Sequence, residues 1–341
     1  MNATMEFDFK LFDHLRPLPR VIEIDTTLLP DPWPEFCEAQ RIRVHAVLGY
    51  ENPAKHIKIW PACNIVGRGI QRGAHLNTDT VTDSSSGNYV LGLNRVLHAV
   101  RNRYPDFPII RVVSVVPRNT PQGKLDLLEA AGIEIEFGED SLDAMRRAET
   151  LAAEHGWWYT RQYWNPDNTE AYGPFGSHVA QSLPNVGIFA CGVGSGGTCS
   201  GVIPALREGL RPHGSNLHAV AVVVESGSAV SGVRTEKALK PGTLDWRGVV
   251  NDVRYIRLEE SLVCSAALWR CDPGSSVFEP CYGGESTGFA LVGGLLSASA
   301  LANMNRLGTF RRPDGNVHLG FIAPDMRDPY RDNFAKHGIF F

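Results

Sequence analysis

Short apolar runs recur along the chain and alternate with stretches that have helical spacing. The runs Val112–Val116 and Val220–Val224 are almost continuously apolar, which is typical of parallel strands buried on both faces. Amphipathic segments such as Lys124–Ala131 and Leu142–His155 lie between the runs. Strands separated by helices predict βαβ units and a mainly parallel sheet. The predicted strands are Val44–Tyr50, Ile109–Val116, Ile133–Phe137, Val186–Cys191, Leu217–Glu225, Val253–Leu258 and Val317–Ala323.

Length and composition are those of a globular protein with room for two domains. The chain has 341 residues, of which 43% are hydrophobic and 21% charged. These values are ordinary for soluble globular proteins. Because the first set of βα units ends near His155–Gly156, we expect an N-terminal α/β domain over residues 1–155 and a C-terminal α/β domain over 156–341.

Charge and the length of the apolar runs argue against nucleic-acid and membrane partners. The net charge is -4 and no long Lys/Arg run is present, so the electrostatic footprint of a nucleic-acid-binding protein is missing. Residues Met1–Lys10 contain no apolar core of signal-peptide length. No apolar run reaches the ~18 residues of a membrane span. We expect neither nucleic acid nor membrane as a partner.

Cysteine and histidine spacing predicts neither a disulfide framework nor a metal site. The seven cysteines are scattered and form no CxxC pair, and the eleven histidines contain no HExxH pattern. This usage fits a reducing, cytoplasmic setting. Cys191 and Cys199, which flank a glycine-rich stretch, are interpreted as small core residues and not as nucleophiles.

A lysine follows an Asn-Pro turn. The predicted strand Val44–Tyr50 leads into Asn52-Pro53, and Lys58 comes just before an apolar segment with helical spacing. An amine held at the start of a helix can attack a carbonyl group. A single lysine of this kind is more often a solvated helix residue, so its interpretation depends on the motifs that follow.

The stretch Ser84-Ser85-Ser86-Gly87-Asn88 precedes a predicted helix over Tyr89–Val100. Hydroxyl groups, a glycine and the positive end of a helix dipole make a place for a carboxylate. An ordinary helix cap with a flexible turn has the same composition.

A glycine-rich stretch, Gly192 to Thr198, follows the predicted strand Val186–Cys191 and opens a helix. Glycines let the backbone close around a phosphate at the helix N-terminus. The same stretch satisfies GxGxxG, and the next strand ends in an acid, Glu225, so a dinucleotide site is the alternative. Phosphate binding alone is favoured, because Glu225 lies further from the glycines than the usual ~20 residues.

The stretch Gly284-Glu285-Ser286-Thr287-Gly288 matches the G-x-S-x-G elbow of hydrolases. A hydrolase would need an acid and a histidine downstream, for which Asp314 and His318 are the available pair. Too little chain follows the serine for the strands of a hydrolase fold. A helix cap is compatible with either interpretation.

Taken in order, these motifs resemble one family, the fold-type II pyridoxal-phosphate enzymes, in the cysteine synthase and cystathionine β-synthase branch. That branch carries N-P-x-x-S-x-K, T-S-G-N-T, G-x-G-T-G-G-T and S-[ST]-G, and the resemblance runs from about Leu18 to Tyr330. It implies two three-layer α/β/α domains with mainly parallel sheets, similar to the tryptophan synthase β fold. An early strand may cross into the second domain, and the cofactor, pyridoxal 5'-phosphate, lies between the domains.

The resemblance also implies a role for each motif. Lys58 carries the cofactor as a Schiff base and acts as the catalytic base. Asn88 binds the cofactor's phenolic oxygen, and Ser286 hydrogen-bonds a pyridine nitrogen that stays unprotonated. The substrate carboxylate is held by the serine-rich turn and by Gln162, with Tyr89 at the rim. The expected cofactor-binding residues are Lys58, Asn88, Gly194, Ser195, Gly196, Gly197, Thr198 and Ser286, and the expected substrate-binding residues are Ser85, Ser86, Tyr89 and Gln162.

Several positions depart from the family pattern. His56 replaces the usual Ser or Thr before the lysine, Tyr89 replaces Thr, and the G-I-G-A-G substrate loop is missing from the segment Gly232 to Arg247. The cofactor motifs are retained and the substrate motifs are altered, which indicates a specialised pathway. The segment Pro324–Tyr330 resembles the closing segment of synthases that make precursors of 2,3-diaminopropionate, although a surface turn would look the same.

The resemblance implies a cytoplasmic homodimer that acts on amino acids. The expected reaction is β-replacement on O-phospho- or O-acetyl-L-serine through an aminoacrylate, with sulfur or an amine as the nucleophile. One alternative is a lyase that eliminates the leaving group and releases a 2-oxo acid. An alternative of another class is a protein that keeps the fold only to bind a metabolite or a partner.

Overall fold

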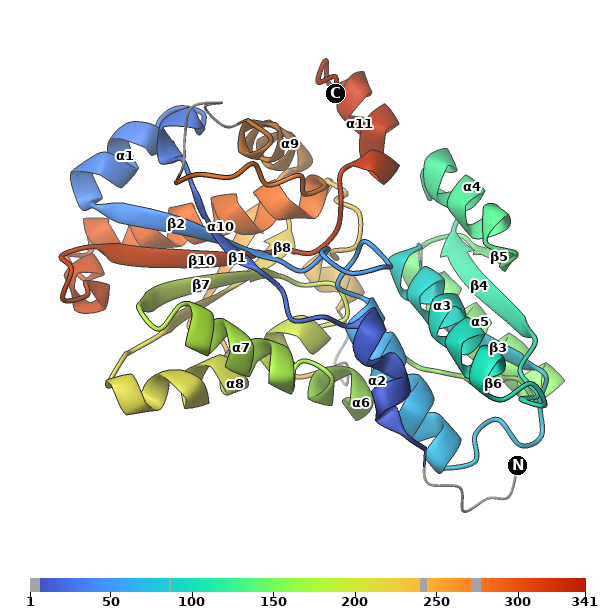
Figure 1. Cartoon of the computed structure of the whole chain (residues 1–341). Coiled ribbons are helices and arrows are strands. Elements are labelled where there is room, and N and C mark those ends of the chain that lie inside the picture. The colour runs from blue at the N-terminus through green and yellow to red at the C-terminus, as the bar shows by residue number, and fades with distance from the viewer. Residues whose placement is uncertain (1–6, 86, 240–243, 271–276) are drawn as a thin grey trace. The chain divides into compact units, whose positions relative to one another are not determined.

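The computed structural model describes residues 7–85, 87–239, 244–270 and 277–341. The chain divides into two compact units (Figure 1). Unit 1 comprises Met1–Pro17 and Asn52–Ala171, and unit 2 comprises Leu18–Glu51 and Tyr172–Phe341. Each unit contains a mainly parallel sheet with helices packed on it, so the predicted α/β class is confirmed.

This division differs from the expected ranges 1–155 and 156–341. Strand β6 (Trp158–Tyr159) pairs with β3 (Thr80–Ser84), and helix α6 (Pro166–Glu170) packs on α2 (Ile59–Gln71). These contacts keep the chain in unit 1 as far as Ala171. The physical reason is that the two-residue strand β6 completes the edge of the first sheet after the expected boundary.

Unit 1 is built on a four-stranded parallel sheet in the order β5-β4-β3-β6. Helix α5 packs along β3 and β4, while α2 and α3 pack on each other. Strand β3 is buried although it is largely polar, because the hydroxyl of Thr82 donates to the carbonyl oxygen of Val113 at 3.0 Å. The other elements are β4 (Arg111–Pro117), β5 (Glu134–Gly138), α3 (Asn88–Arg103), α4 (Gln122–Ala130) and α5 (Ser141–His155).

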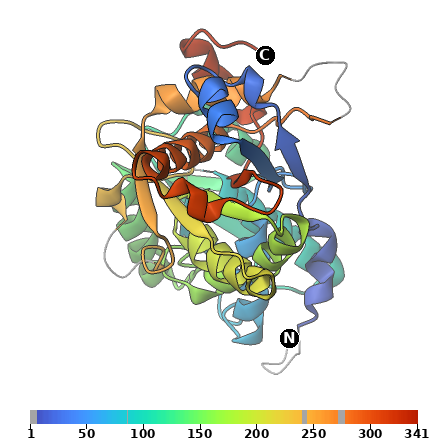
Figure 2. The ribbon, with the colours of Figure 1, turned by 90° about the vertical axis from the view of Figure 1, so that its left-hand side faces the viewer.

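Unit 2 is built on a six-stranded sheet in the order β1-β2-β10-β7-β8-β9. The edge strand β1 pairs antiparallel with β2, and every other pairing is parallel. Helices α7 and α8 lie together on one side of the sheet, and α10 lies on the other (Figures 1 and 2). The strands are β1 (Val21–Ile24), β2 (Ile42–Leu48), β7 (Val186–Gly192), β8 (His218–Val224), β9 (Asp252–Ile256) and β10 (Val317–Ala323). The helices are α1 (Trp33–Gln40), α7 (Gly173–Ser182), α8 (Gly197–Leu210), α9 (Leu258–Leu268), α10 (Glu285–Asn303) and α11 (Arg331–Lys336).

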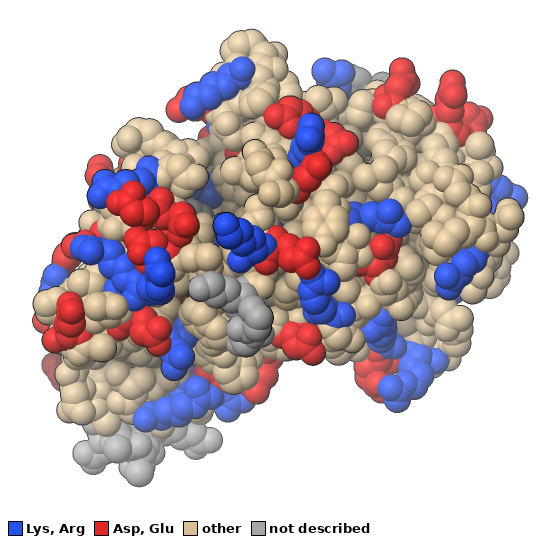
Figure 3. Space-filling view, turned by 180° about the vertical axis from the view of Figure 1, so that it is seen from behind, with Lys and Arg blue, Asp and Glu red and all other residues tan. Residues whose placement is uncertain are grey.

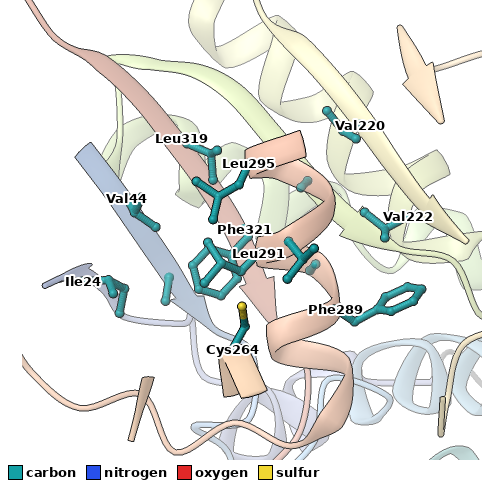
Figure 4. Packing of buried hydrophobic residues seen from close by; sticks show 14 of the residues in the cluster. Ile24, Val44, Val220, Val222, Cys264, Phe289, Leu291, Leu295, Leu319 and Phe321 are labelled. Carbon is teal, nitrogen blue, oxygen red and sulfur yellow. The ribbon is translucent and has the colours of Figure 1, made fainter. Parts of the chain in front are cut away.

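Helix α10 is the centre of the unit 2 core. Its side chains Leu291 and Leu295 lie beside Phe321 and Leu319 of β10, and Phe289 points toward the side of the helix where Val222 of β8 lies (Figure 4). By length and composition α10 could also cross a membrane, with a mean hydropathy of 1.2. Since 78% of that stretch is buried inside the protein, its apolar character is accounted for by core packing.

Basic and acidic side chains are interspersed on the face shown in Figure 3. Among the ion pairs of unit 2, Arg257 pairs with Glu225 at 2.7 Å and Arg254 with Asp252 at 2.7 Å. The charges on the described part of this face therefore alternate in sign and do not form one broad basic or acidic patch.

Candidate functional site

Lys58 lies at the N-cap position of α2, directly before Ile59, and is half-buried. Asn52 fixes the turn that leads to it. The side-chain oxygen of Asn52 accepts from the N–H of Ala54 at 2.9 Å, and its amide nitrogen donates to the carbonyl oxygen of His56 at 3.1 Å. The Asn-Pro turn therefore holds the lysine at the start of the helix.

His56, two residues before the lysine, is buried. Burial lowers its pKa to about 3, so the ring is neutral at physiological pH. Its Cε1 would lie 3.2 Å from a methyl group at Gly92 of α3, and the carbonyl oxygen of Lys58 3.3 Å from it. The closeness of α2 and α3 at this point depends on Gly92 and brings Lys58 near the helix that Asn88 opens.

The serine-rich turn connects β3 to α3. The Ser85 N–H donates to the carbonyl oxygen of Val115 at 3.2 Å, and the Ser85 hydroxyl accepts from the Gly87 N–H at 3.3 Å. Gly87 has a φ of 142°, which a residue with a side chain rarely adopts. Asn88 is the first residue of α3 and is half-buried. Ser86 lies outside the described residues.

Gln162 and Asp83 support the serine-rich turn through hydrogen bonds. The side-chain amide of Gln162 donates to the carbonyl oxygen of Ser84 at 2.8 Å, and its backbone N–H donates to Asp83 at 3.0 Å. The hydroxyl of Thr160 donates to the same oxygen of Asp83. In this structure the amide of Gln162 supports the turn itself, so its proposed contact with a substrate carboxylate would use the second N–H of the same amide or follow a side-chain rotation.

Tyr89, the second residue of α3, is buried in unit 1. Its side chain is 1% exposed and lies among residues of unit 1 that include Asp83 and Thr160. Burial, assisted by the charge of Asp83, raises the pKa of its hydroxyl. The ring turns from the first turn of α3 into the interior of unit 1, and its contact with a substrate stays a prediction.

Asp83 gives unit 1 a pH dependence that can be measured. Burial raises the pKa of its carboxyl group to about 7 from 3.8. The folded chain therefore keeps this proton where the unfolded chain releases it, and stability from this group is lost as the pH rises from about 4 through 7. Asp83→Asn removes the effect, which is on the order of 2–4 kcal/mol. We expect the urea midpoint of Asp83→Asn to gain on wild type between pH 5 and pH 8.

The exposed Asp126→Asn serves as the control for this prediction, since Asp126 lies on the surface of α4. Its urea midpoint should change with pH as in wild type. An Asp83→Asn variant that loses stability between pH 5 and pH 8 as steeply as wild type would contradict the assignment.

Lys124 was not singled out from the sequence. It is 2% exposed on α4, and its side chain packs 3.4 Å from the position of a methyl group at Gly87. Its charge also acts on His56. In the sequence, Lys124 stands on the apolar face of the amphipathic segment that forms α4. That position alone does not connect it with the candidate site, because the contact with the serine-rich turn depends on how α4 packs.

In unit 2 the glycine-rich stretch joins β7 to α8. Ser195, Gly196 and Gly197 are buried, Gly194 and Thr198 are half-buried, and α8 begins at Gly197. Gly196 has a φ of +91°, and a methyl group there would lie 3.0 Å from the carbonyl oxygen of Leu244 and from Trp246. The first N–H groups of a helix have no partner within the helix. The start of α8 therefore offers N–H donors, and the backbone at Gly196 has no room for a side chain.

Ser286 lies in the first turn of α10 and is 4% exposed. Its hydroxyl donates at 3.1 Å to the carboxylate of Asp325. Asp325 follows the end of β10 by two residues. Because β7 and β10 are neighbouring parallel strands, their carboxyl ends meet at one edge of the sheet. The structure therefore brings the glycine-rich loop and Ser286 to the same edge of unit 2. Asp325, in the segment Pro324–Tyr330, and Glu285, in the motif Gly284–Gly288, are further buried polar residues of this edge, and the motifs alone indicated no role for either side chain.

The alternative sites lack their required geometry. Glu225, the acid of the dinucleotide interpretation, is paired with Arg257 at 2.7 Å. His318 near the start of β10 bonds Asp314 at 2.8 Å and His45 at 3.0 Å. Ser286 lies beyond the other end of that strand, about 17 Å away at the usual rise of ~3.3 Å per residue. The histidine and the serine therefore do not form a hydrolase pair.

The described cysteines are buried and free. The hydrogen bond with the neighbouring Cys199 thiol, together with burial, raises the pKa of Cys191, so its sulfur stays protonated. The residues that the structure describes contain no group of three or more His, Cys, Asp or Glu placed to hold a metal ion.

These features fit pyridoxal 5'-phosphate. A phosphate group needs converging N–H donors and close access to the backbone, and Gly196 at the start of α8 provides both. A pyridine nitrogen needs one hydrogen-bonding partner, and Ser286 is a buried hydroxyl at the same edge. Unit 1 offers Lys58 as the amine for the cofactor aldehyde and Asn88 for its phenolic oxygen, and these two roles stay predictions.

Comparison with known proteins agrees with this fit. Residues 26–263, more than half of the chain, match the family described as pyridoxal-phosphate dependent enzyme. A cysteine synthase of Staphylococcus aureus is 29% identical over 195 residues, which are 55% of this chain and 59% of that protein. The match therefore spans less than two thirds of this relative's length.

Solved structures share the fold over nearly the whole chain. O-ureido-L-serine synthase has a TM-score of 0.72 at 20% identity, covering 96% of this chain and 95% of its own. The O-acetylserine dependent cystathionine beta-synthase of Helicobacter pylori has a TM-score of 0.69 at 21% identity, covering 94% and 96%. At these identities the likeness shows the fold alone.

Proposed function

Because the chain belongs to the pyridoxal-phosphate-dependent enzyme family, we propose that it is a transferase that carries out β-replacement on an O-activated L-serine. O-Phospho-L-serine and O-acetyl-L-serine are the proposed substrates, and sulfur or an amine is the incoming nucleophile. The observation that carries the proposal is the combination of Lys58 at the start of α2 with the glycine loop at the start of α8. The similarity to cysteine synthases supports the same reaction class.

Lys58 has two roles in the proposed reaction. Its amine would hold the cofactor covalently, and the same amine, once free, would remove the proton from the substrate Cα as general base. When bound, pyridoxal phosphate takes up the negative charge that develops at Cα, so the substituent on Cβ can leave. The Asn52 turn serves the proton transfer by fixing where the lysine starts.

The other residues bind and orient. Ser85 and Ser86, with the N-terminus of α3, hold the substrate carboxylate, and Gln162 fixes that turn through Ser84. Asn88 holds the phenolic oxygen of the cofactor. The N–H groups of Gly194 to Thr198 hold its phosphate, where the α8 dipole adds attraction.

The test is product analysis with the purified, cofactor-loaded protein. O-Acetylserine or O-phosphoserine is incubated with sulfide, thiols or amines, and the products are identified by mass spectrometry. A new β-substituted alanine supports replacement. A 2-oxo acid with ammonia and no such product would reassign the protein to elimination, and an unchanged substrate would indicate a binding protein.

We also expect faster product formation with an organic thiol or amine than with sulfide. The reason is the missing G-I-G-A-G loop between Gly232 and Arg247, since that loop closes a sulfide-sized site in the similar cysteine synthases. Tyr89 contributes nothing to this preference because its ring is buried. Initial rates at matched nucleophile concentrations measure the preference, and faster cysteine formation from sulfide would contradict it.

A further inference from the structure

The segment Val230–Arg234, which follows β8, lies against the start of the glycine-rich loop. The Arg234 N–H donates to the carbonyl oxygen of Val193 at 2.9 Å. A methyl group at Gly192 would lie 3.0 Å from the side chain of Val233. The segment is therefore bound to the residues that lead directly into the glycine-rich loop.

The connection between β8 and β9 meets the loop a second time further along the chain. A methyl group at Gly196 would lie 3.0 Å from the carbonyl oxygen of Leu244 and from Trp246. The place of the loop thus depends on this connection near both of the loop's ends.

Glu285, the first residue of α10, bonds the same connection with a side chain that is fully buried. One of its carboxyl oxygens accepts from the Ser231 N–H at 2.9 Å. The other accepts from the side-chain amide of Asn333 in α11 at 2.7 Å. Both donors are N–H groups, so the carboxyl oxygens are the acceptors in both bonds.

These hydrogen bonds link segments that are far apart in the sequence. Ser231 and Asn333 are 54 and 48 positions from Glu285. Helix α10 packs on β7 and β10 and lies at the centre of the unit 2 core (Figure 4). Glu285 therefore fastens the segment Val230–Arg234, and through it Val193, to a helix that the core holds in place.

We propose that Glu285 is a positioning residue that, by holding Ser231, keeps the N–H groups of the glycine-rich loop at the spacing that a phosphate group requires. The inference rests on the proposed function, in which these N–H groups bind the phosphate of the cofactor. Glu285 acts through Ser231 and Val193, so its loss should weaken the binding of ligands that carry a phosphate and spare those that lack one.

The test compares pyridoxal 5'-phosphate with pyridoxal, which has the same ring and aldehyde but no phosphate. Each is titrated into the full chain after removal of the cofactor, and absorbance gives the dissociation constant. We expect Glu285→Ala to raise the constant for pyridoxal phosphate about tenfold, the effect of losing one or two hydrogen bonds. The constant for pyridoxal should stay within about twofold of the wild-type value. A general loosening of the fold would raise both constants alike.

Two variants identify the hydrogen bond that matters. Glu285→Gln keeps an oxygen that accepts from the Ser231 N–H, and the Asn333 amide can turn its own oxygen toward the new NH₂ group. This variant should bind both ligands as wild type does. Asn333→Ala removes only the bond to α11 and should also keep the wild-type constants. Should Glu285→Ala fail to fold, Glu285→Met fills the same volume without an acceptor and must show the same selective loss.

Equal weakening of both ligands in Glu285→Ala overturns the proposal, and so does an unchanged constant for pyridoxal phosphate. A Glu285→Gln variant that loses as much affinity as Glu285→Ala overturns it as well. The titrations require no turnover. If the product assay finds no β-replacement while the loss is selective for the phosphate, the reaction assignment fails and the role of Glu285 stands.

Discussion

Lys58→Ala is expected to abolish both the covalent attachment of pyridoxal phosphate and the turnover of amino acids. The side chain is half-buried at the N-cap of α2, and none of the hydrogen bonds that define the Asn52 turn uses its amine. The variant should therefore fold. Loss of the nucleophile and base should lower the rate by about 10³-fold or more. Borohydride reduction followed by mass spectrometry of the intact chain measures the attachment.

Lys55→Asn is the matched control, since Lys55 is exposed on the same turn with a φ of 60°, a conformation that asparagine tolerates. It should keep the attachment and the activity. The buried Lys124 is the rival anchor, because it lies beside Gly87. If Lys58→Ala still yields a reduced cofactor adduct, and peptide mapping finds it on Lys124, the assignment of Lys58 is wrong.

The seven strands predicted from apolar runs are all present, with shifted ends. The apolar pattern is most continuous in β4 and β8, which are buried along almost their whole length. Strand β3 was missed. Its sequence Thr-Val-Thr-Asp-Ser is polar, and its burial depends on partners such as Thr160, which lies 77 residues from Asp83. A pattern over a few neighbouring residues cannot indicate a hydrogen bond between residues that are 77 positions apart.

The domain boundary shows the same limit. The end of the first set of βα units predicts a boundary near His155–Gly156, and Gly156 does end α5 in the left-handed conformation. The chain instead adds β6, whose two residues Trp158 and Tyr159 are too short to form a periodic pattern. The pairing of β6 with β3 moves the division to Ala171.

Within the candidate site, motifs that act through their own backbone could be predicted. The glycine loop needs only its own conformation and the start of α8. The contacts of side chains whose partners are distant in the sequence could not be predicted. The acceptor for Ser286 is Asp325, 39 residues away, and the direction of Tyr89 depends on how α3 packs.

Gly196→Asp is expected to weaken the binding of pyridoxal phosphate by at least about 100-fold. The first cause is steric, because Gly196 has a φ of +91° and any Cβ would lie 3.0 Å from the Leu244 carbonyl oxygen. The second is electrostatic. Two unit charges 4 Å apart repel by about 4 kcal/mol at an effective dielectric constant of about 20. Titration of the cofactor-free protein, followed by fluorescence or absorbance, gives the dissociation constant.

Two further variants separate these causes. Gly196→Ala carries the steric part without the charge, so its affinity should lie between those of wild type and Gly196→Asp. Gly214→Asp adds a carboxylate at another glycine with positive φ (61°), where no atom lies within 4 Å of the new Cβ, and it should bind the cofactor as wild type does.

The same loop would serve a dinucleotide if the GxGxxG interpretation held. In that case NAD would raise the melting temperature of wild type more than pyridoxal phosphate does, and Gly196→Asp would remove that shift. We expect no shift with NAD, since Glu225 is already paired with Arg257.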